Sequence, residues 1–302
     1  MITPRRLAIV AAALSDDARE AARLARVHGF AGLLFDAYSP SLSIPGLSAS
    51  GLREFARVVR AQDRQLIGLR VDVSSRGLGI GADVDRELQR LERAMASAAA
   101  LAAPLLCVDL GGLPSPPYTA PAAPKVTPEE AGLIIIPQAT ELRSKPPSAP
   151  QSSQPFDAVA AAQVDSALVE LGRRADRYSV TVAVRSDLAS FAAIQRALKS
   201  ADCPWFGLDL DPVAVLRDAW SMEQVLSEFG PILRHVRIRD AQRGAEGRTK
   251  PMPLGAGATD WRRLLADLDA AAYTGWLTID PLELPDRRAA AAGALDCLTH
   301  LA

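Results

Sequence analysis

The chain has 302 residues, and its 34 basic and 35 acidic residues leave a net charge of −1 at pH 7. This balance argues against a nucleic-acid-binding stripe and against a general attraction to anionic membranes. The three cysteines, Cys107, Cys203 and Cys297, are far apart in apolar surroundings, which indicates reduced thiols and neither a disulfide framework nor a zinc cluster. No apolar run is long enough to cross a bilayer, so we expect a cytoplasmic protein without a membrane partner. Because of the charge balance we also expect no nucleic-acid partner.

The first apolar run, residues 6–14, allows two interpretations. Arg5 and Arg6 stand before its apolar residues and small residues follow, as in a secretory signal. The run is short, however, and the Ser-Asp-Asp sequence at 15–17 directly after it is typical of a helix start. We therefore interpret this region as a first strand followed by a first helix.

Eight short apolar runs alternate with segments that carry apolar residues at helical spacing. The strand-like runs are 6–14, 32–38, 66–73, 104–112, 180–187, 205–212, 235–241 and 276–283. The helical segments are 15–30, 51–65, 83–103, 158–178, 188–202, 221–230, 259–275 and 285–302. Eight such repeats close most simply into a single (β/α)8 TIM barrel over residues 1–302. A doubly wound open sheet is the alternative, but no glycine-rich dinucleotide fingerprint follows the first strand.

One segment interrupts the repeats. Residues 113–157, after the fourth strand, are rich in Pro, Ser and Ala and form a long loop insertion in the barrel. The C-terminal ends of the strands carry the active sites of TIM barrels, so this insertion would overhang such a site. The sequence leaves two interpretations open, a lid over the mouth of the barrel and a disordered loop.

Charged side chains stand at the C-terminal ends of the predicted strands. Strand alternation places them on the inner face of the barrel, at similar heights. They are Arg185, Asp211, Arg237 and Asp280 in the last four strands, His235 and Arg239 beside Arg237, and Asp36, Arg70, Asp72 and Asp109 in the earlier strands. The mouth of the barrel is therefore predicted to be acidic in its first half and to alternate in charge in its second half.

Five segments of the sequence resemble the sugar phosphate isomerase/epimerase family of xylose isomerase-like TIM barrels. They are GFAGLLFDA, CVDLGGLP, GLDLDPVAVL, HVRIRDA and MPLGAGATDWRRLLADLDAAAYTGWLTID. The resemblance covers nearly the whole chain outside the insertion. It implies a (β/α)8 barrel that acts on a sugar with a divalent metal. The metal ligands of the family are a Glu on strand five, an Asp followed three residues later by a His on strand six, a His on strand seven and a Glu on strand eight.

Most of these ligand positions are substituted in this chain. The fifth-strand position is Arg185, the sixth-strand Asp is Asp211 with Ala214 in place of its His partner, the seventh is Arg237 and the eighth is Asp280. Two carboxylates flanked by two guanidiniums make a poor cation site. Our hypothesis is that Arg185 and Arg237 pair with Asp211 and Asp280 and replace the charge of the ion, so that no cofactor is needed.

Each of several charged residues at the mouth has a predicted role, and some also have an alternative role. The predicted catalytic residues are Asp211, Asp280 and His235, and the predicted substrate-binding residues are Arg185, Arg237, Arg239, Asp109 and Trp276. For Arg237 and Arg239 the alternative is a structural salt-bridge network around Asp211, Asp280 and Asp240. For His235 we favour a neutral, hydrogen-bonded core histidine, because neighbouring arginines disfavour its charged form. Asp109 either holds ligand hydroxyls or caps the loop that follows.

Two functions remain open from the sequence. The first is an isomerase- or epimerase-like enzyme for a small polyol, sugar or sugar phosphate, in which Asp side chains move a proton and Arg185 and Arg237 stabilise an enolate-like charge without metal. The second is a non-catalytic descendant of such enzymes that serves as a ligand-binding or interaction module, because a fold does not guarantee a chemistry.

Overall fold

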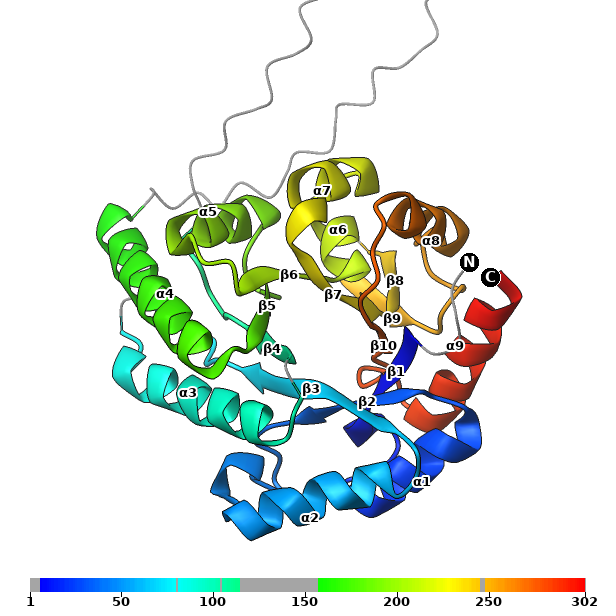
Figure 1. Ribbon diagram of the computed structural model, residues 1–302. Coiled ribbons are helices and arrows are strands. Elements are labelled where there is room, and N and C mark those ends of the chain that lie inside the picture. Colours follow the sequence, from blue (N-terminus) through cyan, green and yellow to red (C-terminus); the bar gives the residue numbers. More distant parts are fainter. Residues whose placement is uncertain (1–5, 80, 104, 115–156, 245–247, 302) are drawn as a thin grey trace, which may run out of the picture.

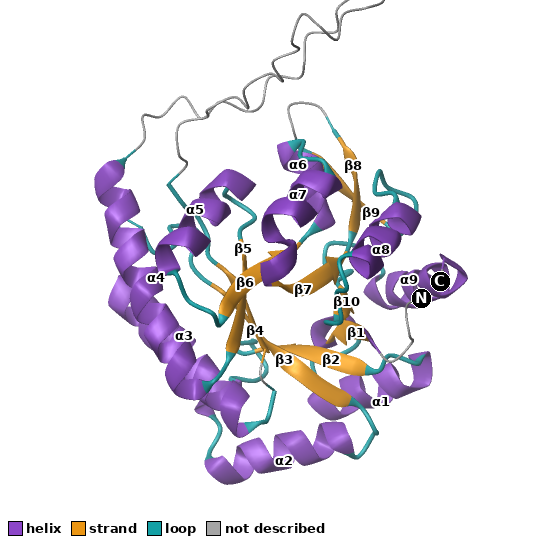
Figure 2. Ribbon diagram, turned by 45° about the horizontal axis from the view of Figure 1, so that its top comes forward, coloured by secondary structure: helices purple, strands orange, loops and turns teal. Residues whose placement is uncertain are grey.

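A closed barrel of parallel strands, surrounded by helices, forms the body of the molecule (Figures 1 and 2). The computed structural model describes residues 6–79, 81–103, 105–114, 157–244 and 248–301. The predicted insertion at 113–157 lies almost wholly outside the described residues. The (β/α)8 architecture predicted from the sequence is confirmed.

The eight barrel strands follow one another around the barrel in chain order, and the last pairs with the first. They are β1 (Leu7–Val10), β2 (Gly32–Asp36), β3 (Gln65–Asp72), β4 (Leu105–Asp109), β5 (Thr181–Arg185), β6 (Phe206–Leu210), β7 (Leu233–Ile238) and β10 (Leu277–Ile279). Each of them overlaps one of the predicted runs. The run at 6–14 therefore begins with a strand, as we interpreted it, and its residues Ala11–Ala13 form a short 3-10 helix.

Helices cover the outside of the barrel (Figure 2). They are α1 (Ala18–His28), α2 (Ala49–Arg60), α3 (Val84–Ala100), α4 (Ala158–Tyr178), α5 (Phe191–Ala201), α6 (Pro212–Asp218), α7 (Met222–Phe229), α8 (Trp261–Ala270) and α9 (Arg287–Leu301). Local sequence sets their starts: Asp17 caps α1, Ser48 caps α2 and Asp260 caps α8, each accepting a hydrogen bond from a backbone amide. None of the described helices has both the length and the apolar character to span a membrane.

Two elements of the fold were not predicted. An antiparallel hairpin, β8 (Asp240–Arg243) with β9 (Thr249–Met252), extends from the end of β7, where the sequence suggested a plain loop. The short helix α6 begins directly after β6, capped by Asp211 and with Pro212 in its first turn. Both elements stand at the C-terminal end of the barrel, beside the predicted site.

The interior of the barrel is divided between apolar and charged residues. Small and medium apolar side chains, including Ala8, Leu34, Leu105 and Ala183, form one buried cluster inside it. Arg185 is the next inward-facing residue after Ala183, and it is charged. The second, larger core lies between the strands and the helices. The apolar cluster therefore fills the part of the barrel at the N-terminal ends of the strands, which we call the lower part, and ionised groups occupy the C-terminal end.

Candidate functional site

Four guanidiniums and eight carboxylates meet at the C-terminal end of the barrel, and we call this set the mouth network. Its members are Arg70, Arg185, Arg237 and Arg239 with Asp36, Asp72, Asp109, Asp187, Asp209, Asp211, Asp280 and Glu283. Each guanidinium lies within ion-pair distance of at least two carboxylates. The network thus connects strands on opposite sides of the barrel.

Asp280 holds the centre of the network together with two arginines. Its Oδ2 lies 2.9 Å from Arg237 Nη2 and 3.3 Å from Arg70 Nη1. The predicted contact between Arg237 and Asp280 is therefore confirmed. Burial by itself would raise the pKa of Asp280, but the Arg237 and Arg70 guanidiniums lower it to about 2. Asp280 is thus a carboxylate at neutral pH, held by two positive charges.

Arg185 has other partners than those we predicted. Its Nη1 lies 2.8 Å from Asp109 Oδ2 and 2.6 Å from Asp187 Oδ1, and the predicted pair with Asp211 is wrong. The reason is register: Asp109 and Arg185 are directly adjacent on β4 and β5, whereas Asp211 lies beyond the end of β6. Asp109 also accepts a hydrogen bond from the amide of Gly111, so it caps the following loop as well as holding Arg185. Burial raises the pKa of Asp109, although Arg185 opposes this.

Asp211 pairs with Arg239 instead. Arg239 Nε donates to Asp211 Oδ2 at 2.7 Å, while Asp211 Oδ1 accepts from the amide of Val213 and so begins α6. Arg239 also contacts Asp187 at 3.1 Å and Glu283 at 2.9 Å. One guanidinium thereby ties together the loops that follow β5, β6 and β10.

Asp240 is not part of the network, which corrects our alternative for Arg237 and Arg239. Its carboxylate accepts hydrogen bonds from the amides of Ala241, Gly255, Gly257 and Thr259 and from the indole of Trp261. A Cβ at Gly257 would lie 2.1 Å from Asp240 Oδ1, so the loop can approach the carboxylate only with glycine there. Asp240 therefore fixes the loop that leads into α8.

His235 lies fully buried below the mouth network. Its Nδ1 is 2.6 Å from Asp209 Oδ1 and its Nε2 is 2.7 Å from Thr278 Oγ1, which makes it the hydrogen-bonded core histidine we favoured. The prediction that it is neutral is wrong. Burial lowers the pKa of His235, but the Cys107 sulfur and the Asp209 carboxylate outweigh burial and raise it to about 10. The ring is therefore an imidazolium that donates to Asp209 and Thr278.

Trp276 faces into the barrel, but at the wrong end for its predicted role. It precedes β10, and its ring packs against the apolar cluster inside the barrel, close to Gly32. Asp280 lies four residues further along the chain, about 13 Å away at the rise of a strand. Trp276 therefore closes the lower part of the barrel and does not reach a ligand at the mouth.

Several network members were absent from the predicted site. Strand alternation placed Arg70 at the mouth and also turns Asp209 inward, beside Asp211, but neither residue was given a catalytic or binding role. Asp187 and Glu283 follow β5 and β10 in loops, where alternation gives no orientation. For these two residues only the folded contacts reveal that they belong to the site.

A family model described as xylose isomerase-like TIM barrel matches residues 22–301 of the sequence. The chain belongs to this family. No protein with a curated description matches the chain.

Solved structures of family-like barrels superpose over nearly the whole chain. A xylose isomerase domain protein from Planctomyces limnophilus is 15% identical, with a TM-score of 0.69 over 98% of this chain and 95% of its own. D-allulose 3-epimerase from Methylomonas sp., solved with D-allulose, is 15% identical, with a TM-score of 0.67 over 98% and 97%. The probable 3-DHS dehydratase AsbF from Bacillus anthracis is 9% identical, with a TM-score of 0.71 over 97% and 98%. At these identities the likeness shows the fold alone.

The residues at the family's metal-ligand positions do not suit a divalent cation. Of the five positions, Arg185 and Arg237 carry guanidiniums and Ala214 has no ligand atom in its side chain. The oxygens of Asp211 are occupied by the Val213 amide and by Arg239, and Oδ2 of Asp280 faces Arg237 and Arg70. A cation there would meet fixed positive charges before it met a free ligand oxygen.

A second donor group lies deeper in the barrel. The possible ligand atoms of Cys107, Asp209 and His235 lie within 4.8 Å of one another. Both ring nitrogens of His235 already take part in hydrogen bonds, and Asp209 Oδ2 lies 3.6 Å from Arg237 Nε and 3.9 Å from Arg185 Nε. This group also fits a cation poorly, because two guanidiniums compete for its carboxylate.

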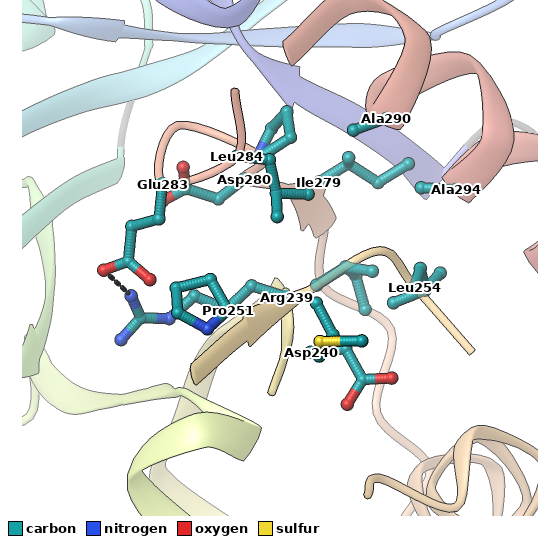
Figure 3. A pocket seen from close by; sticks show the side chains of 13 residues that line it. Arg239, Asp240, Pro251, Leu254, Ile279, Asp280, Glu283, Leu284, Ala290 and Ala294 are labelled. Atoms are coloured by element: carbon teal, nitrogen blue, oxygen red, sulfur yellow. Dashed lines mark hydrogen bonds and ion pairs between the residues drawn. The ribbon is translucent and has the colours of Figure 1, made fainter. Parts of the chain in front are cut away.

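A small pocket lies beside the mouth network, between the β8–β9 hairpin, the loop after β10 and α9 (Figure 3). Its walls are mostly apolar, and the ion pair of Arg239 with Glu283 forms one edge. The space that a water-sized sphere can occupy inside it is about 20 Å³. This volume suits about one water molecule and is too small for a sugar.

Proposed function

We propose that this protein binds a small polyhydroxylated compound, such as a sugar, at the C-terminal mouth of the barrel, and that it does so without a divalent metal. The observation that carries the proposal is the position of Arg237, whose guanidinium contacts Asp209 and Asp280 at the place where the family resemblance expects a metal-binding histidine. A fixed cation of this kind keeps the carboxylates ionised, as a metal would.

Three further points support a polyol or sugar ligand. Carboxylates and guanidiniums together offer both acceptors and donors for hydroxyl groups. Three carboxylates of the network, Asp72, Asp187 and Glu283, have more than 40% of their side chains exposed and so meet solvent at the rim of the mouth. Among the structural neighbours, D-allulose 3-epimerase and D-psicose 3-epimerase were solved with D-allulose and D-tagatose.

We favour ligand binding over the isomerase reaction as the primary function. A general base needs a pKa near the working pH, and that of Asp280 is held at about 2. His235 is buried and protonated, and Asp211 is occupied by Arg239 and by α6. The catalytic roles of Asp211, Asp280 and His235 stay predictions.

Isomerase- or epimerase-like catalysis is the second candidate function, and Asp109 is the observation that favours it. This carboxyl is buried at the mouth with a raised pKa, next to the Arg185 guanidinium. A carboxyl with a raised pKa is a better base than Asp280, and a neighbouring arginine can stabilise a developing enolate.

Calorimetric titration tests the first proposal. D-Allulose, D-tagatose, D-fructose and small polyols are titrated into the full chain in EDTA, and again after addition of Mn²⁺. We expect saturable binding of at least one compound with the same affinity in both buffers, and no saturable rise in melting temperature with Mn²⁺, Mg²⁺ or Zn²⁺. Binding that appears only with a metal, or no binding of any compound, contradicts the proposal.

Proton exchange separates the two candidate functions. The bound compound is incubated with the protein in D₂O and its C–H signals are followed by NMR. Exchange that disappears in Asp109→Asn establishes catalysis. Binding without exchange identifies a non-catalytic ligand-binding module.

A further inference from the structure

The side chain of Asp187 reaches between two arginines at the mouth of the barrel. Asp187 lies in the loop after β5, and its Oδ1 is 2.6 Å from Arg185 Nη1 and 3.1 Å from Arg239 Nη2. Arg185 ends β5 and Arg239 follows β7, so the carboxylate stands near the end of β6, the strand between them. The Asp187 side chain is 42% exposed, whereas those of Arg185 and Arg239 are 8% and 12% exposed. Asp187 therefore lies on the solvent side of both guanidiniums.

Each of these two arginines also has another carboxylate partner. Arg185 Nη1 lies 2.8 Å from Asp109 Oδ2, its neighbour in the strand register. Arg239 Nε donates to Asp211 Oδ2 at 2.7 Å. If Asp187 turned away, both guanidiniums would still be paired. The contact with Asp187 is thus an additional one, and it is not needed to neutralise a buried charge.

The backbone of the loop is held independently of the Asp187 carboxylate. Arg217 on α6 donates to the carbonyl oxygen of Asp187 at 2.6 Å and to that of Ala189 at 2.7 Å. Ser186 Oγ donates to the carbonyl oxygen of Gly111 at 2.6 Å and accepts from the amide of Ala189 at 2.8 Å. Because these bonds fix the backbone, Asp187 can leave the arginines by rotation of its side chain alone.

The position between the two arginines favours a carboxylate. Burial raises the pKa of Asp187, but the guanidiniums of Arg185 and Arg239 outweigh burial and lower it below its ordinary value. The ionised form therefore gains more from this position than the neutral form does, in spite of the other carboxylates of the mouth network. Guanidiniums are also the side chains best suited to the recognition of carboxylates.

We infer that Asp187 is an autoinhibitory group: its carboxylate occupies an anion-binding position formed by Arg185 and Arg239, and a carboxylate from solution binds there when Asp187 turns out. The inference goes beyond the proposed function, because it concerns a carboxylate and requires no sugar. Asp187 competes with the external carboxylate from within the same chain. The apparent affinity for that carboxylate is therefore reduced by the fraction of molecules in which the position is open.

The test uses malonate as the probe and malonamide as its uncharged counterpart. Both are titrated into the full chain by calorimetry at constant ionic strength. In Asp187→Ala the position is always open, so we expect malonate to bind at least about tenfold more tightly than to the unaltered protein, as for an open fraction of about 10% or less. Adding Arg239→Gln to this variant should remove the gain. The matched control is Asp36→Ala, which removes a mouth carboxylate that contacts one arginine, Arg70, at 2.6 Å. Its affinity for malonate should differ from that of the unaltered protein by less than about threefold, as expected for one partly exposed charge.

Each outcome of these titrations decides the inference. If Asp187→Ala does not fold, as judged by circular dichroism, Asp187→Asn replaces it, because a neutral amide competes less well than a carboxylate and a gain of at least about threefold is still expected. The inference is overturned if malonate binds neither protein, or binds both equally. It is also overturned if malonamide binds as well as malonate, or if Asp36→Ala gains as much affinity as Asp187→Ala. None of these results affects the proposed function, which the sugar titrations test, and failure of every sugar to bind would leave the malonate result intact.

Discussion

Replacing Arg237 with methionine removes the positive charge between Asp209 and Asp280 while nearly keeping the volume of the side chain. Asp280 then retains only Arg70 as a close cation, at 3.3 Å, and Asp209 retains His235 at 2.6 Å. Breaking a buried ion pair by removing one partner costs about 3 to 5 kcal/mol. Because each aspartate keeps at least one cation, we expect a loss near the lower end, about 3 kcal/mol of unfolding free energy at pH 7.

The pH dependence of this loss provides the diagnostic result. The pKa of Asp280 in the folded protein, about 2, is below its ordinary value of 3.8. A lowered pKa contributes stability above pH 3.8 that is lost as the pH falls through about 2, and it corresponds to about 2 kcal/mol. In Arg237→Met burial dominates and raises the pKa of Asp280, so that protonation now stabilises the folded state. The loss relative to the unaltered protein should therefore shrink between pH 7 and pH 4.

Urea denaturation at pH 7, 5.5 and 4 measures this effect. The matched control is Arg196→Met, which breaks the partly buried pair of Arg196 with Asp165 at 2.8 Å on the outside of the barrel. We expect the control to lose about 1 kcal/mol at most. A loss below 1 kcal/mol for Arg237→Met, or a loss that does not change with pH, would refute the view that Arg237 stabilises two buried carboxylates.

Two further changes test the surroundings of the mouth. In Asp240→Asn an amide replaces the carboxylate that accepts hydrogen bonds from several N–H donors, and we expect the unfolding free energy to fall by about 2 to 4 kcal/mol. The control Asp260→Asn keeps a good helix cap, and its unfolding free energy should stay within about 0.5 kcal/mol of the unaltered protein in the same urea assay. The raised pKa of His235 adds to the unfolding free energy. This contribution is fully present below pH 6.5 and is lost as the pH rises through about 10, so the unfolding free energy should fall between pH 7 and 9.5. His235→Gln should flatten this slope while His300→Gln, on the surface, leaves it unchanged; equal slopes in all three proteins would contradict an imidazolium at this position.

The sequence predicted the barrel because each strand is a short apolar run bounded by a helix start. It did not predict the β8–β9 hairpin, since its strands contain Gln242, Lys250 and Pro251 and carry no strong strand pattern. It also did not predict α6, because the apolar residues of this seven-residue helix follow β6 almost without a break. Tertiary contacts stabilise both elements, and a local sequence pattern does not show such contacts.

The members of the site were easier to predict than their pairing. Alternation along a strand gives the face of a residue, and it correctly turned His235, Arg237 and Arg239 inward. Pairing depends on the height of each residue in the barrel, and height depends on strand register. The register between β2 and β3 shifts at Leu33/Leu34, and that between β6 and β7 shifts at Leu208/Asp209. Such shifts cannot be read from one sequence.

The two errors in the predicted site have other causes. Arg185 pairs with the adjacent Asp109 because Asp211 lies beyond the end of β6, and Trp276 stands four residues before Asp280, at the other end of the barrel.

The proposed replacement of a metal by guanidiniums has a chemical consequence that extends beyond charge. Arg237 can hold Asp209 and Asp280 ionised, as a cation would. A guanidinium is coordinatively saturated, however, and its N–H groups bind a sugar oxygen only by hydrogen bonds. It therefore cannot polarise a carbonyl by direct coordination, which is the main contribution of a metal to such chemistry. Among the described residues, the mouth of this barrel offers hydrogen-bond donors and acceptors that suit hydroxyl groups, and its charged groups fit a Lewis-acid metal poorly. We therefore propose ligand binding before isomerisation.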